Sequence, residues 1–201
     1  HPRASVHVIS PDPVESYLAW LPALDELVIF PLEEERSLQL IAEADLIFHL
    51  DHNQISRLRY PRLVEAATSA QAPRVLIDHH LYPEAGFDLT FSYAEASATS
   101  ELIHALALAL GWRSAITPDL ATLLLTGIIT DTGRFMYSHL SPELFVTTSD
   151  LLVLGADYPH VIDRLSYHNP EVQIRLQGYV LDQRMELYPE LGAACLTLTQ
   201  E

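Results

Sequence analysis

The first 80 residues alternate short β-prone apolar runs with segments of helical length. Apolar runs at 6–9, 27–30, 46–50 and 74–77 are separated by candidate helices at 14–24, 33–44 and 58–70. Strands that alternate with helices in this way form right-handed βαβ units and a parallel sheet. We therefore expect an α/β fold, a three-layer domain whose mainly parallel sheet is flanked by helices.

The rest of the chain reads as a helical C-terminal portion. After one more strand at 89–92, the pattern is helical to about residue 188. Helix starts that combine a capping side chain, a proline and a carboxylate are typical of helix N-termini. They occur at Thr117-Pro118-Asp119, Ser141-Pro142-Glu143 and Asn169-Pro170-Glu171. Gly155 is expected to end the second of these helices, and residues 193–199 are β-prone.

The net charge, the cysteine count and the length of the apolar runs limit which partners and compartments the protein suits. The formal net charge is −16, and a surface this acidic repels long duplex nucleic acid. An anionic substrate would therefore need metal ions or a local basic cluster. The single cysteine, Cys195, excludes an internal disulfide and suits a reducing compartment. No apolar run reaches the length of a membrane span, so we expect a cytoplasmic protein without a membrane partner.

Acidic and imidazole side chains follow two of the predicted strands. The run at 74–77 leads directly into Asp78-His79-His80, and the run at 46–50 leads into Asp51. The carboxyl ends of parallel strands lie at one edge of a sheet, where α/β proteins usually bind ligands. A strand that simply ends in polar loop residues is the ordinary alternative for either run alone.

A third acid, Asp131, follows the apolar segment 123–129, and Gly133 indicates a tight backbone just beyond it. Carboxylates next to buried surface are costly unless they are paired, hydrogen-bonded or bound to metal. One such acid is usually a cap or turn residue, but three of them beside two histidines favour a metal site.

Mixed carboxylate and imidazole ligands suit Mn²⁺, Mg²⁺ or Fe²⁺. Two such ions about 3.5–4 Å apart hydrolyse phosphate esters by activating a bridging water and neutralising the attacking and leaving oxygens. The sequence contains no phosphate-binding P-loop, no dinucleotide-binding glycine fingerprint and no nucleophile elbow.

At these positions the sequence resembles the DHH phosphoesterase superfamily. Ile77-Asp78-His79-His80 is similar to the triplet that names the superfamily, and residues 126–135, Thr-Gly-Ile-Ile-Thr-Asp-Thr-Gly-Arg-Phe, resemble its fourth motif. Residues 45–51 resemble the second motif, and residues 98–102 resemble the helix start that follows the triplet. The likeness is strongest to the bacterial two-domain group of nanoRNA and pAp phosphatases, which is related to exopolyphosphatases and includes cyclic dinucleotide phosphodiesterases.

The resemblance implies roles at the matching positions. Asp51, His79 and Asp131 would be metal ligands, with Asp51 able to bridge two ions. His80 would lie close to the scissile phosphate and contact the substrate. Asp78 would support the two imidazoles from behind, so that Asp78, His79 and His80 form the catalytic centre.

Arg134 in the fourth motif is a weaker candidate for a phosphate contact, because loop arginines are ordinarily solvated. The remaining histidines near these motifs are interpreted as surface or cap residues; they are His52, His139 and His168.

The sequence also departs from the family pattern. The first motif, His-x-x-Pro-Asp-Gly-Asp-Ala, is not found, and Ser10-Pro11-Asp12-Pro13 does not replace it. The C-terminal substrate domain with its Gly-Gly-Gly-His loop is not found either. In the second motif, Asp51-His52-Asn53 replaces the commoner Asp-Cys-Gly. We expect residues 1–188 to be a DHH-type catalytic domain without its first motif, and residues 189–201 to begin a DHHA1-type substrate-binding domain.

The resemblance predicts a Mn²⁺-dependent phosphodiesterase or phosphatase that hydrolyses short oligonucleotides, pAp, or cyclic and linear dinucleotides to mononucleotides. Two metal ions are expected in the complete protein, with Mg²⁺ as an alternative, and an activated hydroxide would attack phosphorus in line. The 201-residue chain alone is expected to be inactive or weakly active. The alternatives are an exopolyphosphatase or pyrophosphatase, and a degenerate domain that binds nucleotides without catalysis. A homodimer is an open alternative to a monomer.

Overall fold

The structure is a computed structural model that describes residues 4–137, 140–167 and 170–199. Within these ranges, none of the helices combines the length and the apolar character needed to cross a membrane.

The strands of the first half pair in parallel, as the sequence predicts. They are β1 (Val8–Ser10), β2 (Leu27–Ile29), β3 (Ile47–Leu50), β4 (Arg74–Asp78) and β5 (Leu89–Ser92). β1 and β2 form one small sheet, and β3, β4 and β5 form a second, with β4 in the centre. The pairing of Leu50 with Ile77 brings the carboxyl ends of β3 and β4 to the same edge.

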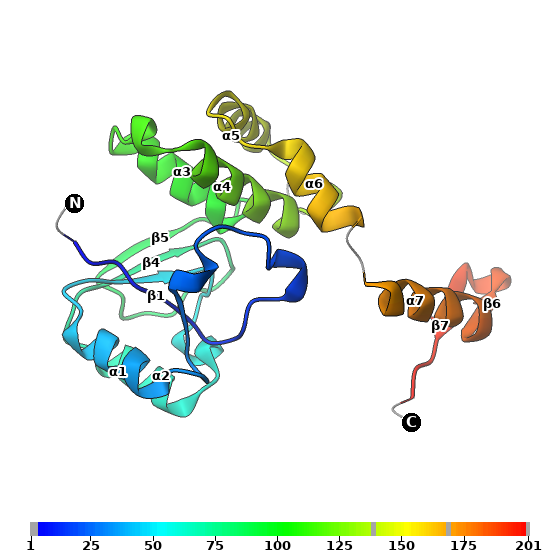
Figure 1. The fold of residues 1–201 in the computed structure, drawn as a ribbon, viewed down its shortest axis with the longest axis horizontal. Helices are drawn as coiled ribbons and strands as arrows, with labels where there is room; N and C mark the ends of the chain where they lie inside the picture. Colours follow the sequence, from blue (N-terminus) through cyan, green and yellow to red (C-terminus); the bar gives the residue numbers. More distant parts are fainter. Residues whose placement is uncertain (1–3, 138–139, 168–169, 200–201) are drawn as a thin grey trace.

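Helices make up much of the rest of the described chain. They are α1 (Glu34–Glu43), α2 (Pro61–Ser69), α3 (Thr99–Ala109), α4 (Pro118–Asp131), α5 (Pro142–Val153), α6 (Tyr158–Tyr167) and α7 (Glu171–Gln183). α1 and α2 lie on one side of the strands, and α3 and α4 lie on the other (Figure 1). The predicted α/β class, with parallel strands between helices and a helical C-terminal portion, is confirmed.

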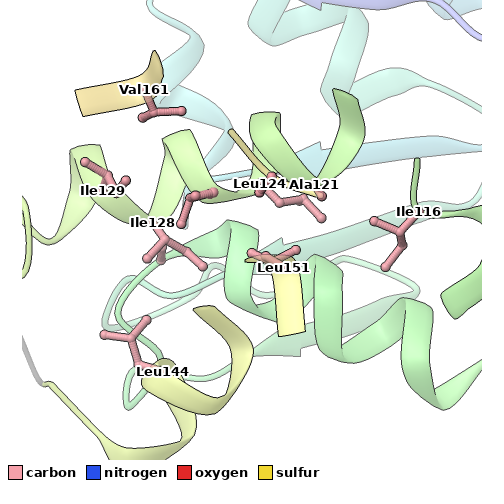
Figure 2. Packing of buried hydrophobic residues seen from close by; sticks show 11 residues of the cluster. Ile116, Ala121, Leu124, Ile128, Ile129, Leu144, Leu151 and Val161 are labelled. Carbon is pink, nitrogen blue, oxygen red and sulfur yellow. The ribbon is translucent and has the colours of Figure 1, made fainter. Parts of the chain in front are cut away.

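The largest hydrophobic cluster joins α4 to its neighbours (Figure 2). Leu125 and Ile128 of α4, Leu144 and Leu151 of α5, and Val161 of α6 are fully buried in it. Burial of such a side chain contributes roughly 1.5–3 kcal/mol. α4 is therefore held on several sides, which fixes the position of Asp131 at its C-terminal end. A smaller cluster around Phe30, Ile41 and Leu63 holds α1 and α2 against β2.

Two predicted helix starts are confirmed in atomic detail. The Thr117 hydroxyl accepts a hydrogen bond from the Leu120 amide at 3.2 Å, and the Ser141 hydroxyl accepts one from the Leu144 amide at 3.0 Å. Gly155 follows α5 with φ of +97°, as a helix-ending glycine does. The third predicted cap, Asn169, lies outside the described residues.

The predicted helix at 14–24 is wrong. This segment forms two short 3₁₀ turns, Ser16–Leu18 and Leu24–Glu26, with irregular backbone between them. Pro22 explains the failure, because proline lacks the amide donor and its ring clashes with the preceding helical turn. In the predicted helix 58–70, Pro61 does not interrupt the helix but starts it, with its nitrogen at the first helical position.

The C-terminal end also differs from the helix predicted to residue 188. α7 ends at Gln183, and β6 (Met185–Tyr188) pairs in antiparallel fashion with β7 (Ala193–Leu196). The predicted domain boundary after residue 188 falls between these paired strands, and the assignment of residues 189–201 to a second domain stays a prediction. α7, β6 and β7 lie together, apart from the helices that cover the sheets (Figure 1).

Candidate functional site

Asp51 is held in an unusual backbone conformation immediately after β3. Its φ is +63°, in the left-handed region that side chains other than glycine adopt at some cost. The Asp51 amide donates to the Ile77 carbonyl at 3.1 Å, which continues the pairing of β3 with β4. Thr99, the first residue of α3, donates its hydroxyl to Asp51 Oδ1 at 2.8 Å. The carboxylate is therefore positioned from two separate elements.

His79 presents one ring nitrogen to two carboxylates. Its Nδ1 lies 3.3 Å from the Ala96 carbonyl oxygen, and because a carbonyl only accepts, the proton belongs on Nδ1. Its Nε2 lies 3.4 Å from Asp51 Oδ1 and 3.9 Å from Asp131 Oδ2. The turn after β3, the turn after β4 and the end of α4 thus meet at this nitrogen.

His80 is oriented by the buried carboxylate of Asp78. His80 Nδ1 lies 2.7 Å from Asp78 Oδ1, and the His80 amide donates to Asp78 Oδ2 at 3.0 Å. Asp78 is fully buried, and each of its two carboxylate oxygens has a hydrogen-bond contact with His80. This arrangement places the proton on His80 Nδ1 and leaves Nε2 as the nitrogen available to a ligand.

Asp131 occupies the last position of α4, where the helix presents carbonyl groups and disfavours a negative charge. Burial, followed by the charge of Asp51, raises the pKa of Asp131. The turn that follows requires Gly133, whose φ is +53° and where an added Cβ would lie 2.1 Å from the Tyr137 ring. The tight backbone predicted at Gly133 is present.

The charges of the site are coupled. Burial alone would raise the pKa of Asp51, but the hydrogen bonds from His79 and Thr99 together lower it. The hydrogen bond to Asp51 in turn raises the pKa of His79, against the opposing effect of burial. A proton on His79 therefore compensates two nearby carboxylates, which is the role that a bound cation would also serve.

The donor set fits a divalent cation. Asp51, His79 and His80 each offer a ligand atom, and these atoms lie within 4.8 Å of one another. Both imidazoles have their second nitrogen engaged by a hydrogen-bond acceptor, the usual support of a metal-binding histidine. Oxygen and imidazole donors suit Mn²⁺, Mg²⁺ or Fe²⁺.

The predicted site residues are distributed as follows. Asp51, His79 and His80 come together, Asp131 flanks His79, and Asp78 lies behind His80.

Arg134 instead donates to the Leu165 carbonyl of α6 at 2.6 Å, so part of its guanidinium group is used within the fold. Its role as a phosphate contact therefore stays a prediction. Two of the histidines interpreted as surface or cap residues, His139 and His168, lie outside the described residues.

Sequence reasoning missed the contacts that support Asp51. His52 is interpreted from the sequence as a surface or cap residue. In the structure its Nε2 lies 2.9 Å from Nδ1 of His49, which is buried. Asn53 donates to the Leu81 carbonyl at 2.6 Å. The sequence carries no signal for the burial of His49, because alternation along β3 would place the apolar Phe48 and Leu50 inside, and the structure instead exposes both of them.

Comparison with known proteins adds independent information. A family model described as the DHH family, N-terminal domain, matches residues 7–128. The bifunctional oligoribonuclease and PAP phosphatase NrnA of Thermus thermophilus is 36% identical over 108 residues, which cover 52% of this chain and 32% of that protein. A probable protein of the same name from Streptococcus mutans is 32% identical over 127 residues, or 63% of this chain and 39% of that one.

Among solved structures, an exopolyphosphatase-related protein from Bacteroides fragilis matches with a TM-score of 0.90 and 33% identity, over 96% of this chain and 56% of that one. The chain spans about a third of the length of the curated relatives named above. Because the family model matches well over half of the 201 residues, and the fold and the Asp78-His79-His80 triplet agree with it, the chain belongs to the DHH family, N-terminal domain.

Proposed function

We propose that this chain is the catalytic domain of a metal-dependent phosphoesterase that acts on short nucleotides. The observation that supports it best is the meeting of Asp51 and Asp131 at Nε2 of His79, at 3.4 and 3.9 Å, beside an oriented His80. Concentrated negative charge of this kind, on a chain with a net charge of −16, suits a cation and through it an anionic substrate.

In this proposal Asp51, His79 and Asp131 hold Mn²⁺, with His80 as a further ligand or as a contact to the substrate phosphate. When bound, the cation supplies Lewis acidity and lowers the pKa of a coordinated water. Because Asp78 retains the proton on Nδ1, His80 Nε2 presents a lone pair that can ligate the cation or accept a proton. Once protonated there, His80 can donate a hydrogen bond to a phosphate oxygen. Asp78 acts only through His80, which it keeps in one orientation.

The names of the relatives support a choice of substrate class. Proteins named oligoribonuclease and PAP phosphatase match residues of this chain at 32–36% identity, so short oligoribonucleotides and pAp are the first candidates. A linear dinucleotide such as pApA combines the two. The acidic surface agrees with a small substrate better than with a long duplex.

The test is hydrolysis of pApA by the purified chain with Mn²⁺, followed by chromatography of the released mononucleotide. We expect slow release that depends on Mn²⁺ and falls to background in His79→Ala, since His79 joins both carboxylates. His7→Ala is the matched control, because His7 is an exposed histidine remote in sequence from the site. Equal release by wild type and His79→Ala, or release that persists in excess chelator, would contradict the proposal.

A second candidate comes from the solved relative, whose description is exopolyphosphatase-related. Inorganic polyphosphate and pyrophosphate should therefore be assayed beside pApA and pAp, with phosphate release as the measurement. Faster release from polyphosphate than from either nucleotide would reassign the substrate while leaving the metal site in place. Nucleotide binding without hydrolysis of any of these substrates would indicate a non-catalytic domain.

A further inference from the structure

The loop that carries Asp51 is tied to the loop that follows His80. We name residues 51–55 the Asp51 loop and residues 79–84 the His79 loop. Asn53 donates its side-chain amide to the Leu81 carbonyl at 2.6 Å, and the Glu84 amide donates to the Asn53 carbonyl at 2.7 Å. The Ile55 amide completes the link by donating to the Glu84 carboxylate at 2.8 Å.

A second set of contacts braces the Asp51 loop from the side of β3. His52 Nδ1 lies 3.0 Å from the Leu50 carbonyl, so its proton is on Nδ1 and its Nε2 accepts from Nδ1 of His49 at 2.9 Å. His49 is 4% exposed, packs edge-on against Phe87 and has a pKa lowered to about 4, chiefly by burial. Of the two histidines, His49 is therefore a neutral imidazole fixed in the protein interior.

These contacts surround Asp51, whose backbone conformation is unfavourable without restraint from neighbouring groups. Asp51 has a φ of +63°, and a left-handed residue other than glycine costs of order 1–3 kcal/mol unless its surroundings determine it. The hydrogen bond from the His52 side chain to the Leu50 carbonyl joins the residues on either side of Asp51. Asn53 then fixes the far end of the turn to the His79 loop.

We propose that His52 and Asn53 are positioning residues that hold Asp51 and the His79 loop at a fixed separation for metal binding. This inference rests on the proposed function and deepens it. Through these hydrogen bonds, His52 and Asn53 supply the restraint for a strained aspartate. Neither side chain is assigned a contact with the metal or the substrate.

The first measurement needs no metal. His52→Phe keeps a ring but removes both hydrogen bonds, and Asn53→Asp keeps the shape but removes the donor to Leu81. We expect amide hydrogen exchange to accelerate by about tenfold or more at Asp51 in His52→Phe, and at Ile55 and Glu84 in Asn53→Asp. Gln54→Ala is the matched control, because Gln54 lies in the same loop with an exposed side chain. Its exchange should equal that of wild type.

The second measurement is the dissociation constant for Mn²⁺, by calorimetric titration of the same proteins, with circular dichroism to verify folding. Loss of a residue that orients a metal ligand typically weakens binding 10–100-fold, and we expect this range for both variants and no change for Gln54→Ala. Affinities equal to that of wild type would overturn the positioning role. If wild type itself binds no Mn²⁺, the proposed function fails. In that case, unchanged exchange in both variants overturns the two loop restraints as well, and accelerated exchange supports them.

Discussion

At the scale of the residue, the site brings two carboxylates close together, which costs electrostatic free energy. Asp51 and Asp131 both approach His79 Nε2, and Asp131 also lies at the carbonyl end of α4. The raised pKa of Asp131 shows that its charge is the one disfavoured in the fold, whereas the lowered pKa of Asp51 shows that the fold stabilises the charge of Asp51. If the site binds a cation as proposed, the cation offsets this cost, and the metal-free form is the less stable one.

Asp131→Asn should therefore change stability and metal affinity in opposite directions. Because the pKa of Asp131 is raised on folding, its ionised form disfavours the fold, and this effect grows as the pH rises through the folded pKa. We expect the metal-free variant to be more stable than wild type at pH 7, by less than about 1 kcal/mol for a group this exposed. The difference should vanish at pH values below the ordinary aspartate pKa. Mn²⁺ affinity should fall at least about tenfold.

Urea unfolding at several pH values, with and without Mn²⁺, measures both effects. Asp119→Asn is the control, since Asp119 is an exposed acid in the first turn of the same helix. A carboxylate at a helix N-terminus is favourable, so this variant should be slightly less stable at pH 7. Its Mn²⁺ affinity should be that of wild type. A loss of stability in Asp131→Asn would contradict the electrostatic account.

At the scale of the element, helix caps and the parallel pairing of the first-half strands were predictable from the sequence, and the antiparallel pairing of β6 with β7 was not. The caps at Thr117 and Ser141 were predicted because a cap depends on neighbours three residues away. The helix predicted at 14–24 failed because apolar content outweighed Pro22 in that interpretation. β6 was missed because it is stabilised by β7, which comes later in the chain, and not by its own sequence.

The same distinction applies to the candidate site. The approach of Asp51 to His79 was expected, because both follow parallel strands that end at one edge. Thr99 and Asn53 were not identified as its supports, since their hydrogen bonds depend on how a loop folds back over the sheet edge. Motif spacing gives the order of such residues but not the directions of their side chains.

The contact of α3 with α4 makes a prediction at this scale. An added Cβ at Gly127 would lie 2.1 Å from Ser100 Oγ and 3.1 Å from its Cβ, so Gly127→Ala must move α3 or the Ser100 side chain. Overpacking of this kind typically costs about 1–3 kcal/mol, of which the helix preference for alanine over glycine offsets up to roughly 1 kcal/mol. Urea unfolding should show that loss, with part of it recovered when Ser100→Ala is added.

Gly178→Ala in α7 is the matched control, because an added Cβ there meets nothing within 4 Å. Alanine is favoured over glycine in a helix by roughly 1 kcal/mol, so this variant should keep or raise the helical content of α7. If Gly127→Ala proved as harmless as Gly178→Ala, the close packing of α3 on α4 would not hold in solution.

At the scale of the whole molecule, the buried clusters and the site belong to the same part of the chain. Both hydrophobic clusters draw their residues from positions up to Leu165, and every site residue lies before Phe135. α7 contains no buried residue, and β6 and β7 expose most of their side chains. The C-terminal helix and hairpin therefore add little to the hydrophobic stabilisation of the rest.

A chain shortened to end at Tyr167 should consequently keep the stability and metal affinity of the full chain. We expect its unfolding temperature to stay within about 4 °C of wild type, the shift that roughly 1 kcal/mol produces in a domain of this size. Its Mn²⁺ dissociation constant should be unchanged. A chain ending at Leu154 is the contrasting case, since it loses α6 and the fully buried Val161. Its unfolding temperature should fall well below that of the chain ending at Tyr167, because losing a large buried apolar side chain alone typically costs about 2–5 kcal/mol. If both shortened chains unfolded together at the lower temperature, α7 and the hairpin would have to pack on the sheet domain in solution.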